Sequence, residues 1–248
     1  MKDKLTATES NILSRIVDFG GYITKDILNM SKPNITIDGC YRILRSLLIK
    51  GYLLERSYYN NNKAYNKAKI YQVTEKGLAA CDRSGAYMRH KHKPPAVHRY
   101  LIRTHFLFSF SERYPVYHCS VREREEYLLS VGYCKENLPQ KYNRSKSGEI
   151  FALSQIEEYL LLEGPFSKEG ELCIVVIDKQ NSGIAAQIVS ILKRYKRMIN
   201  ERKYVLKFLF VTEFEYRARA YMDVYNSRFY DEKFYTITAV SINKKYCP

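Results

Sequence analysis

The sequence has no tryptophan, no run of about 18 consecutive apolar residues, and far fewer acidic than basic residues. Without a long apolar run it offers no candidate membrane-spanning helix, and Met1–Thr6 lacks the apolar core of a signal peptide. We therefore expect a cytoplasmic protein with no membrane insertion. The 41 Lys and Arg residues outnumber the 26 Asp and Glu residues, for a net charge of +15. That surplus favours a nucleic-acid partner; a basic solubility surface, or a ribosomal or anionic-membrane partner, is the alternative.

Closely spaced cysteine pairs are also missing. The six cysteines are scattered along the chain with no C-x-x-C motif, and most stand among apolar residues. This pattern favours buried free thiols over a zinc site.

The first third of the chain carries helix and strand signals in a recognisable order. Thr6–Glu9 forms a potential capping box, and Thr36 can cap a helix that reaches about Lys50 before Gly51. A short helix is expected at 24–30, between these two. Two strands, 52–56 and 70–73, then flank a polar, basic tip. Three helices followed by a two-stranded wing predict a winged helix-turn-helix domain over residues 1–82.

This domain predicts a mode of binding to double-stranded DNA. Its third helix would enter a major groove and present Arg42 and Arg45 to bases or phosphates. The wing would contact the DNA backbone through Lys63, Lys67 and Lys69. The alternative is that these are ordinary solvated charges and that the domain docks a protein instead.

Residues 83–96 are basic, contain Pro94–Pro95 and lack periodicity, which indicates a linker. An amphipathic helix is expected at 97–110 and a charged helix from 121, with 132–147 as a loop. Strands are then expected at 148–153, 172–177, 204–211 and 234–240, with helices at 185–200 and 214–225 between the later ones. Residues 97–248 therefore predict a mixed-sheet α/β domain, and the whole chain is α+β.

Acidic residues near two expected core strands are candidates for metal-dependent chemistry. Glu149 opens one strand, and Asp178 with Lys179 ends the apolar run 172–177. Two such carboxylates can hold Mg²⁺ or Mn²⁺ against a phosphodiester, while a lysine orients the water or neutralises charge. Glu123 is a candidate third acid. The alternative for Asp178–Lys179 is a strand-end turn with a surface lysine.

The helix after Asp178 is basic and extends the expected DNA surface. Lys193, Arg194 and Lys196 are its candidate DNA contacts. The later segment 216–221 alternates Tyr, Arg and Ala, which suits strand binding or an ordinary amphipathic helix. Tyr221 and Tyr225 are candidate nucleophiles, although packing or base stacking is the simpler interpretation.

Short motifs give the chain a family resemblance over nearly its full length. They are His98-Arg-Tyr-Leu, Glu123-Arg-Glu, Gly148-Glu-Ile-Phe, Val176-Ile-Asp-Lys and Lys193-Arg-Tyr. With the expected winged helix, these motifs resemble the bacterial replication-relaxation family, and within it the MobC-type plasmid mobilisation relaxases. The resemblance implies a C-terminal domain like the PD-(D/E)xK restriction endonucleases, with Glu149 and Asp178 as metal ligands.

The motifs also depart from the family pattern. Gly148-Glu149 replaces the usual Pro-Asp, and Val176 replaces the first acid of Glu-x-Asp. Gln180 stands where D/E-x-K has lysine, so that Lys193 or Lys196 would have to substitute.

Two functions follow from the resemblance and the residues together. The first is a relaxase that recognises a plasmid origin of transfer and nicks one strand with a divalent metal, alongside relaxosome or coupling proteins. The alternative is a non-catalytic DNA-binding regulator of plasmid replication, transcription or relaxosome assembly, with a degenerate nuclease domain.

Overall fold

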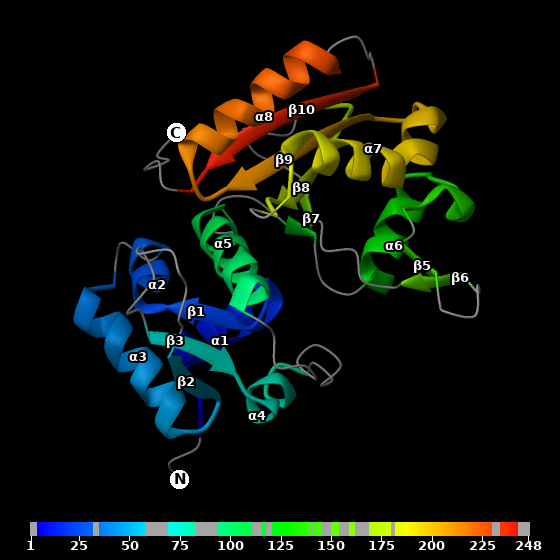
Figure 1. Ribbon diagram of the computed structural model, residues 1–248. Coiled ribbons are helices and arrows are strands. Elements are labelled where there is room, and N and C mark those ends of the chain that lie inside the picture. Colours follow the sequence, from blue (N-terminus) through cyan, green and yellow to red (C-terminus); the bar gives the residue numbers. More distant parts are fainter. Residues whose placement is uncertain are drawn as a thin grey trace. The chain divides into compact units, whose positions relative to one another are not determined.

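The computed structural model divides the chain into two compact units, Met1–Glu112 and Arg113–Pro248 (Figure 1). It describes residues 4–31, 35–57, 69–82, 94–110, 116–117, 121–139, 141–144, 150–153, 159–161, 169–179, 182–229 and 234–242. Both helices and strands occur in each unit, which confirms the expected α+β class.

The first unit combines helices with a small antiparallel sheet. Its strands pair in the order β1-β3-β2, with Tyr22 opposite Gln72 and Leu53 opposite Val73. The elements are α1 (Ala7–Phe19), β1 (Tyr22–Thr24), α2 (Lys25–Ser31), α3 (Ile37–Ile49), β2 (Leu53–Ser57), β3 (Lys69–Val73), α4 (Glu75–Ala79) and α5 (Pro94–Phe110). The three-residue strand β1 was not expected, because so short a segment shows no alternation of polar and apolar residues.

Local sequence signals fix the helix ends of this unit. The predicted capping box is present: Glu9 N donates to Thr6 Oγ1 at 3.2 Å, and Thr6 N donates to Glu9 Oε2 at 2.7 Å. Thr36 accepts a hydrogen bond from Gly39 N at the start of α3. Gly51 follows the C-cap of α3 with φ of +75°, a backbone conformation that glycine adopts without strain.

Glu9 also joins α1 to α3. Its carboxylate accepts hydrogen bonds from Lys50 Nζ at 2.7 Å and Ser46 Oγ at 2.5 Å. Burial alone raises the pKa of Glu9, but the hydrogen bonds from Lys50, Ser46 and Thr6 outweigh it and lower the pKa to about 2. The carboxylate is therefore ionised at neutral pH and holds the two helices together.

Helix α5 belongs to the first unit. Arg103 Nε donates to the Phe19 carbonyl oxygen at 2.7 Å, and the rings of Phe19 and Phe108 meet edge to face at 5.2 Å. Tyr22 and Tyr100 stack at 5.7 Å. The sequence predicts a second domain over residues 97–248, and the division between compact units falls after Glu112. The helix begins at Pro94 rather than Val97, because proline is favoured in a first helical turn.

The second unit is built on a five-stranded mixed sheet with strand order β10-β9-β8-β7-β4. Strands β8, β9 and β10 are parallel, whereas β7 is antiparallel to β8 and β4 is antiparallel to β7. A separate hairpin joins β5 to β6. The elements are β4 (Val116–Tyr117), α6 (Val121–Ser130), the 3₁₀ helix η2 (Lys135–Asn137), β5 (Lys141–Arg144), β6 (Ile150–Leu153), β7 (Tyr159–Leu161), β8 (Glu171–Ile177), α7 (Ile184–Glu201), β9 (Val205–Thr212), α8 (Glu215–Arg228) and β10 (Tyr235–Ser241).

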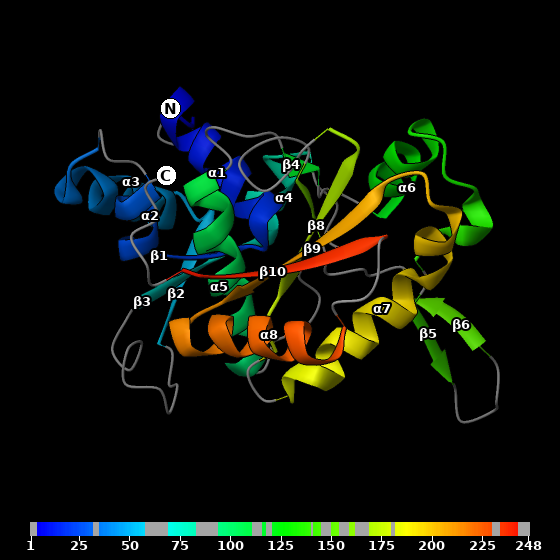
Figure 2. The same cartoon turned by 90° about the horizontal axis from the view of Figure 1, so that it is seen from above.

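Helices α7 and α8 cover the same face of this sheet, as Figure 2 shows. Ile188 and Met198 of α7, Tyr221 of α8 and Ile174 of β8 share one hydrophobic cluster. Cys173 and Val175 of β8 point to the opposite face and are fully buried as well. The predicted strand buried on both faces is therefore confirmed. The segment expected as a loop at 132–147 differs, since it contains η2 and β5.

Candidate functional site

Asp178 lies at the carboxyl end of β8, where the loops that follow the parallel strands begin. Its backbone N–H continues the ladder to the next strand and donates to Val211 O at 2.9 Å. The residue is 0% exposed. A carboxylate buried to this extent needs partners for its charge and for its lone pairs.

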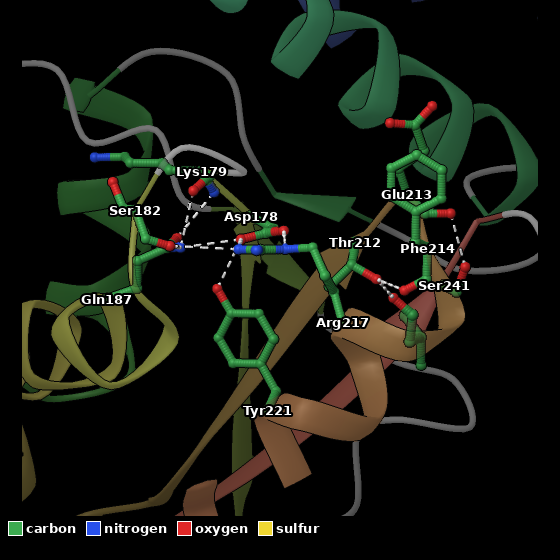
Figure 3. A network of polar contacts seen from close by, with 11 residues as sticks. Asp178, Lys179, Ser182, Gln187, Thr212, Glu213, Phe214, Arg217, Tyr221 and Ser241 are labelled. Atoms are coloured by element: carbon green, nitrogen blue, oxygen red, sulfur yellow. Dashed lines mark hydrogen bonds and ion pairs between the residues drawn. The ribbon is translucent and has the colours of Figure 1, made fainter. Parts of the chain in front are cut away.

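Three side chains satisfy the Asp178 carboxylate (Figure 3). Arg217 binds it with two donors, Nε to Oδ2 at 2.5 Å and Nη2 to Oδ1 at 2.8 Å. Tyr221 Oη donates to Oδ1 at 2.9 Å, and Gln187 Nε2 donates to Oδ1 at 3.0 Å. These four residues form the Asp178 network, which joins β8, α7 and α8.

Gln187 extends the network into the loop after β8. Its Oε1 accepts from Lys179 N at 2.8 Å, while Nε2 donates to Lys179 O at 3.0 Å and to Ser182 O at 3.1 Å. Arg217 Nη2 also donates to Ser182 O, at 3.4 Å. The backbone on both sides of the turn into α7 is therefore held by side chains of the network.

The protonation behaviour of the network follows from its ion pair and from burial. The hydrogen bond with Asp178 raises the pKa of Arg217, so the guanidinium keeps its charge. Burial, followed by the negative charge of Asp178, raises the pKa of Tyr221 far above its usual value. Tyr221 is fully buried and protonated, which does not fit the nucleophile considered from the sequence.

The geometry at Asp178 does not fit a ligand of a divalent cation. A cation bound there would displace the Arg217 guanidinium, whose side chain is only 15% exposed, and would leave it without its counter-ion. Glu149, the expected second ligand, lies outside the described residues. The side chain of Glu123 also lies outside them, although its backbone belongs to α6. Among the described residues, no group of three or more His, Cys, Asp or Glu could hold a metal ion.

Lys179 does not face the carboxylate beside which it stands in the sequence. Its side chain points away from the Asp178 carboxylate (Figure 3). It lines a pocket of about 170 Å³ between the end of β8 and one face of α7. The pocket is lined by Val176, Ile177, Lys179, Ser182, Ala186, Gln187, Ser190, Ile191 and Arg194. Two cationic side chains, Lys179 and Arg194, thus line the same small hollow, together with apolar and uncharged polar residues.

The other DNA-contact candidates on α7 divide between two directions. Lys193 and Lys196 are exposed, whereas Arg194 is half-buried and lines the pocket. The predicted basic helix is therefore present, but its three named cations do not form one surface.

In the first unit, Arg42 and Arg45 are both exposed on α3, opposite the buried side chains of Cys40, Leu44 and Leu47. Lys69 of β3 is 64% exposed and forms an ion pair with Glu55 of β2 at 2.9 Å. Lys63 and Lys67 lie outside the described residues. The structure thus brings the two arginines together on one helix face.

The partners of Asp178 are not evident from the sequence. Arg217 and Tyr221 are four residues apart and therefore share one face of α8. They fall in the Tyr-Arg-Ala repeat that was interpreted as a DNA surface or an amphipathic helix. The spacing was visible, but a cation and a phenol that converge on a strand-end carboxylate depend on the tertiary fold.

Comparisons with known proteins add no relative: no family model matches the chain, and neither a curated protein nor a solved structure does. Across the described segments, every helix is too short or too polar to cross a membrane.

Proposed function

We propose that this protein binds double-stranded DNA through α3. The observation that carries the proposal is the exposed face of α3, on which Arg42 and Arg45 lie while Leu44 and Leu47 anchor the opposite face in the core. A helix held in this way can present its outer face to a DNA groove without disturbing its own packing.

The arrangement around α3 supports a winged helix-turn-helix interpretation. Helix α2 precedes α3 and packs against it, and the antiparallel pair β2–β3 follows. In such a domain the second helix of the pair enters the major groove and the hairpin lies over the backbone. The net charge of +15 supports a polyanionic partner through release of counter-ions from the phosphates.

For the second unit we favour a non-catalytic role. The family resemblance points to plasmid DNA, such as an origin of transfer, and implies nicking with Mg²⁺ or Mn²⁺. That reaction depends on Asp178, whose oxygens are bound by Arg217, Gln187 and Tyr221. We therefore propose a DNA-binding regulator of plasmid replication, transcription or relaxosome assembly, with a metal-dependent relaxase as the second candidate.

The proposal is tested by fluorescence anisotropy with duplexes selected from a random pool by the full-length protein. Arg42→Ala combined with Arg45→Ala is expected to weaken binding to the selected duplex at least tenfold and to reduce the preference over random DNA. Lys135→Ala combined with Arg228→Ala removes the same charge from exposed positions of the second unit and serves as the control. Equal affinity and preference in the two double variants would refute a role for α3.

A further inference from the structure

Helix α3 exposes large apolar side chains on and beside the face that carries its arginines. Ile37 is 53% exposed, Tyr41 is 44% exposed and Ile49 is 74% exposed. The helix already has a complete core face in Cys40, Leu44 and Leu47. Ile37 and Tyr41 lie one helical turn apart and so form a pair of exposed apolar side chains, a feature typical of a binding surface.

Helical periodicity arranges this face in two adjacent rows. Ile37, Tyr41 and Arg45 follow one another at intervals of four residues, and Asp38 and Arg42 form the row beside them. Ile49 continues the first row but lies at the far end of the helix, about 18 Å from Ile37 at a rise of 1.5 Å per residue. The first half of α3 thus combines apolar, acidic and basic side chains within two turns.

That combination matches the edges of bases better than it matches phosphates. In the major groove, thymine offers a 5-methyl group to apolar side chains, guanine offers two acceptors to arginine, and cytosine offers an amino donor to a carboxylate. Asp38 would be repelled by the phosphate backbone but can accept a hydrogen bond from cytosine. Residues near the start of a recognition helix are also the ones that reach bases.

We infer that Ile37 and Tyr41 read the 5-methyl groups of thymine in the DNA site that α3 binds. The inference rests on the proposed function and adds the chemical basis of its sequence preference. Apolar contact with a methyl group supplies discrimination without a hydrogen bond, so the isoleucine and the tyrosine ring both suit the role. The nearby arginines supply attraction and guanine contacts.

The experiment replaces thymine with deoxyuridine, which removes only the methyl group. Duplexes are first selected from a random pool by the wild-type protein, and each thymine of the consensus is then replaced in turn. At one or two positions affinity is expected to fall about three- to fivefold, the size of one methyl contact. Ile37→Ala or Tyr41→Ala is expected to abolish that penalty at one position each. Ile49→Ala, a control at the far end of α3 whose side chain is more exposed than either, retains it.

Each outcome decides a separate question. A protein that selects DNA but shows no thymine-to-uracil penalty, or whose penalty persists in both Ile37→Ala and Tyr41→Ala, overturns this inference and leaves the proposed function intact. A consensus without thymine overturns it as well. If no duplex is enriched, and α3 instead mediates protein contact or self-association, the proposed function itself fails. Circular dichroism and thermal unfolding confirm that the exposed substitutions leave the fold unchanged.

Discussion

The guanidinium of Arg217 and the carboxylate of Asp178 form a two-point ion pair inside the second unit, with Nε on one carboxylate oxygen and Nη2 on the other. The two residues are 39 positions apart in the chain, at the end of β8 and near the start of α8. A pair of this kind fixes orientation as well as distance, because both ions are planar. It makes Asp178 the structural centre of the carboxyl end of the parallel strands.

Breaking this pair is expected to destabilise the second unit. Asp178→Asn leaves the Arg217 guanidinium partly buried without its counter-ion and should lower the free energy of unfolding by about 3 kcal/mol. Tyr221→Phe removes one donor to a carboxylate that keeps its other donors and should cost about 1.5 kcal/mol. Urea unfolding followed by circular dichroism measures both. Equal stability of Asp178→Asn and wild type would contradict the structural role.

Divalent cations are expected to leave the stability unchanged. A metal that binds only the folded state raises the melting temperature by mass action, by an amount set by its concentration relative to Kd. Because the Asp178 oxygens are bound by protein donors, millimolar Mg²⁺ or Mn²⁺ should give the same melting temperature as a chelator. A rise that is present in wild type and absent in Asp178→Asn and Glu149→Ala would instead support the relaxase candidate. Nicking of supercoiled plasmid by wild type but not by these variants would support it further.

The carboxylate of Glu9 gives the first unit a predictable response to acid. Its pKa of about 2 lies below the usual value of 4.5, so its contribution to stability is fully present above about pH 4.5 and is lost as the pH falls towards 2. In Glu9→Gln this part of the pH dependence should be absent, and the variant should be less stable at pH 7 by about 2 kcal/mol. Urea unfolding at several pH values tests this. Parallel stability curves for wild type and variant would contradict it.

Gly77 in α4 is expected to tolerate no side chain. A Cβ there would lie 2.5 Å from the backbone oxygen of Tyr52, which cannot move without disturbing the turn that precedes β2. Gly77→Ala should therefore cost at least about 2 kcal/mol. Gly183, the N-cap of α7, has negative φ and nothing within 4 Å of a Cβ, so Gly183→Ala is the matched control. The idea fails if thermal unfolding shows similar, small effects for the two variants.

The exposed lysines of α7 give a test of DNA contact by the second unit. Lys193→Ala combined with Lys196→Ala should weaken binding similarly for all duplexes and reduce the slope of log affinity against log salt by about one per lost phosphate contact. The sequence preference should not change, in contrast to the α3 variants. An unchanged slope would exclude phosphate contacts by these two lysines.

Much of the secondary structure was predictable because its signals are local. Helix starts are marked by hydrogen bonds within a few residues, as at Thr6 with Glu9 and at Thr36. The end of α3 is marked by the backbone conformation of Gly51. The apolar run that became β8 indicated burial on both faces. Strand β1 was missed because three residues are too few to show a periodic pattern. The amphipathic pattern of 97–110 predicted a helix, but such a pattern does not identify the surface against which the helix packs.

The candidate site was predictable only as a position. The end of an apolar strand correctly drew attention to Asp178, but a carboxylate that binds a metal and one that binds an arginine look alike in sequence. The difference lies in Arg217 and Tyr221, which reach Asp178 only after α8 has packed on the sheet. The exposure of Ile37 and Tyr41 could not be predicted from the sequence either. Both are apolar and lie at helical spacing beside the buried residues of α3, so the pattern alone does not separate them from the core.

The place of α5 also sets where the chain can be cut. A fragment that stops at residue 82 would keep all three strands of the small sheet yet lose Phe108 and Arg103, the covers of the Phe19 ring and carbonyl. It would expose to solvent the apolar side chains that α5 covers. The affinity of α3 for a ligand, measured on such a fragment, would then differ from the affinity of the full chain. A fragment that ends after Glu112 retains α5, and truncation studies of the N-terminal part should begin there.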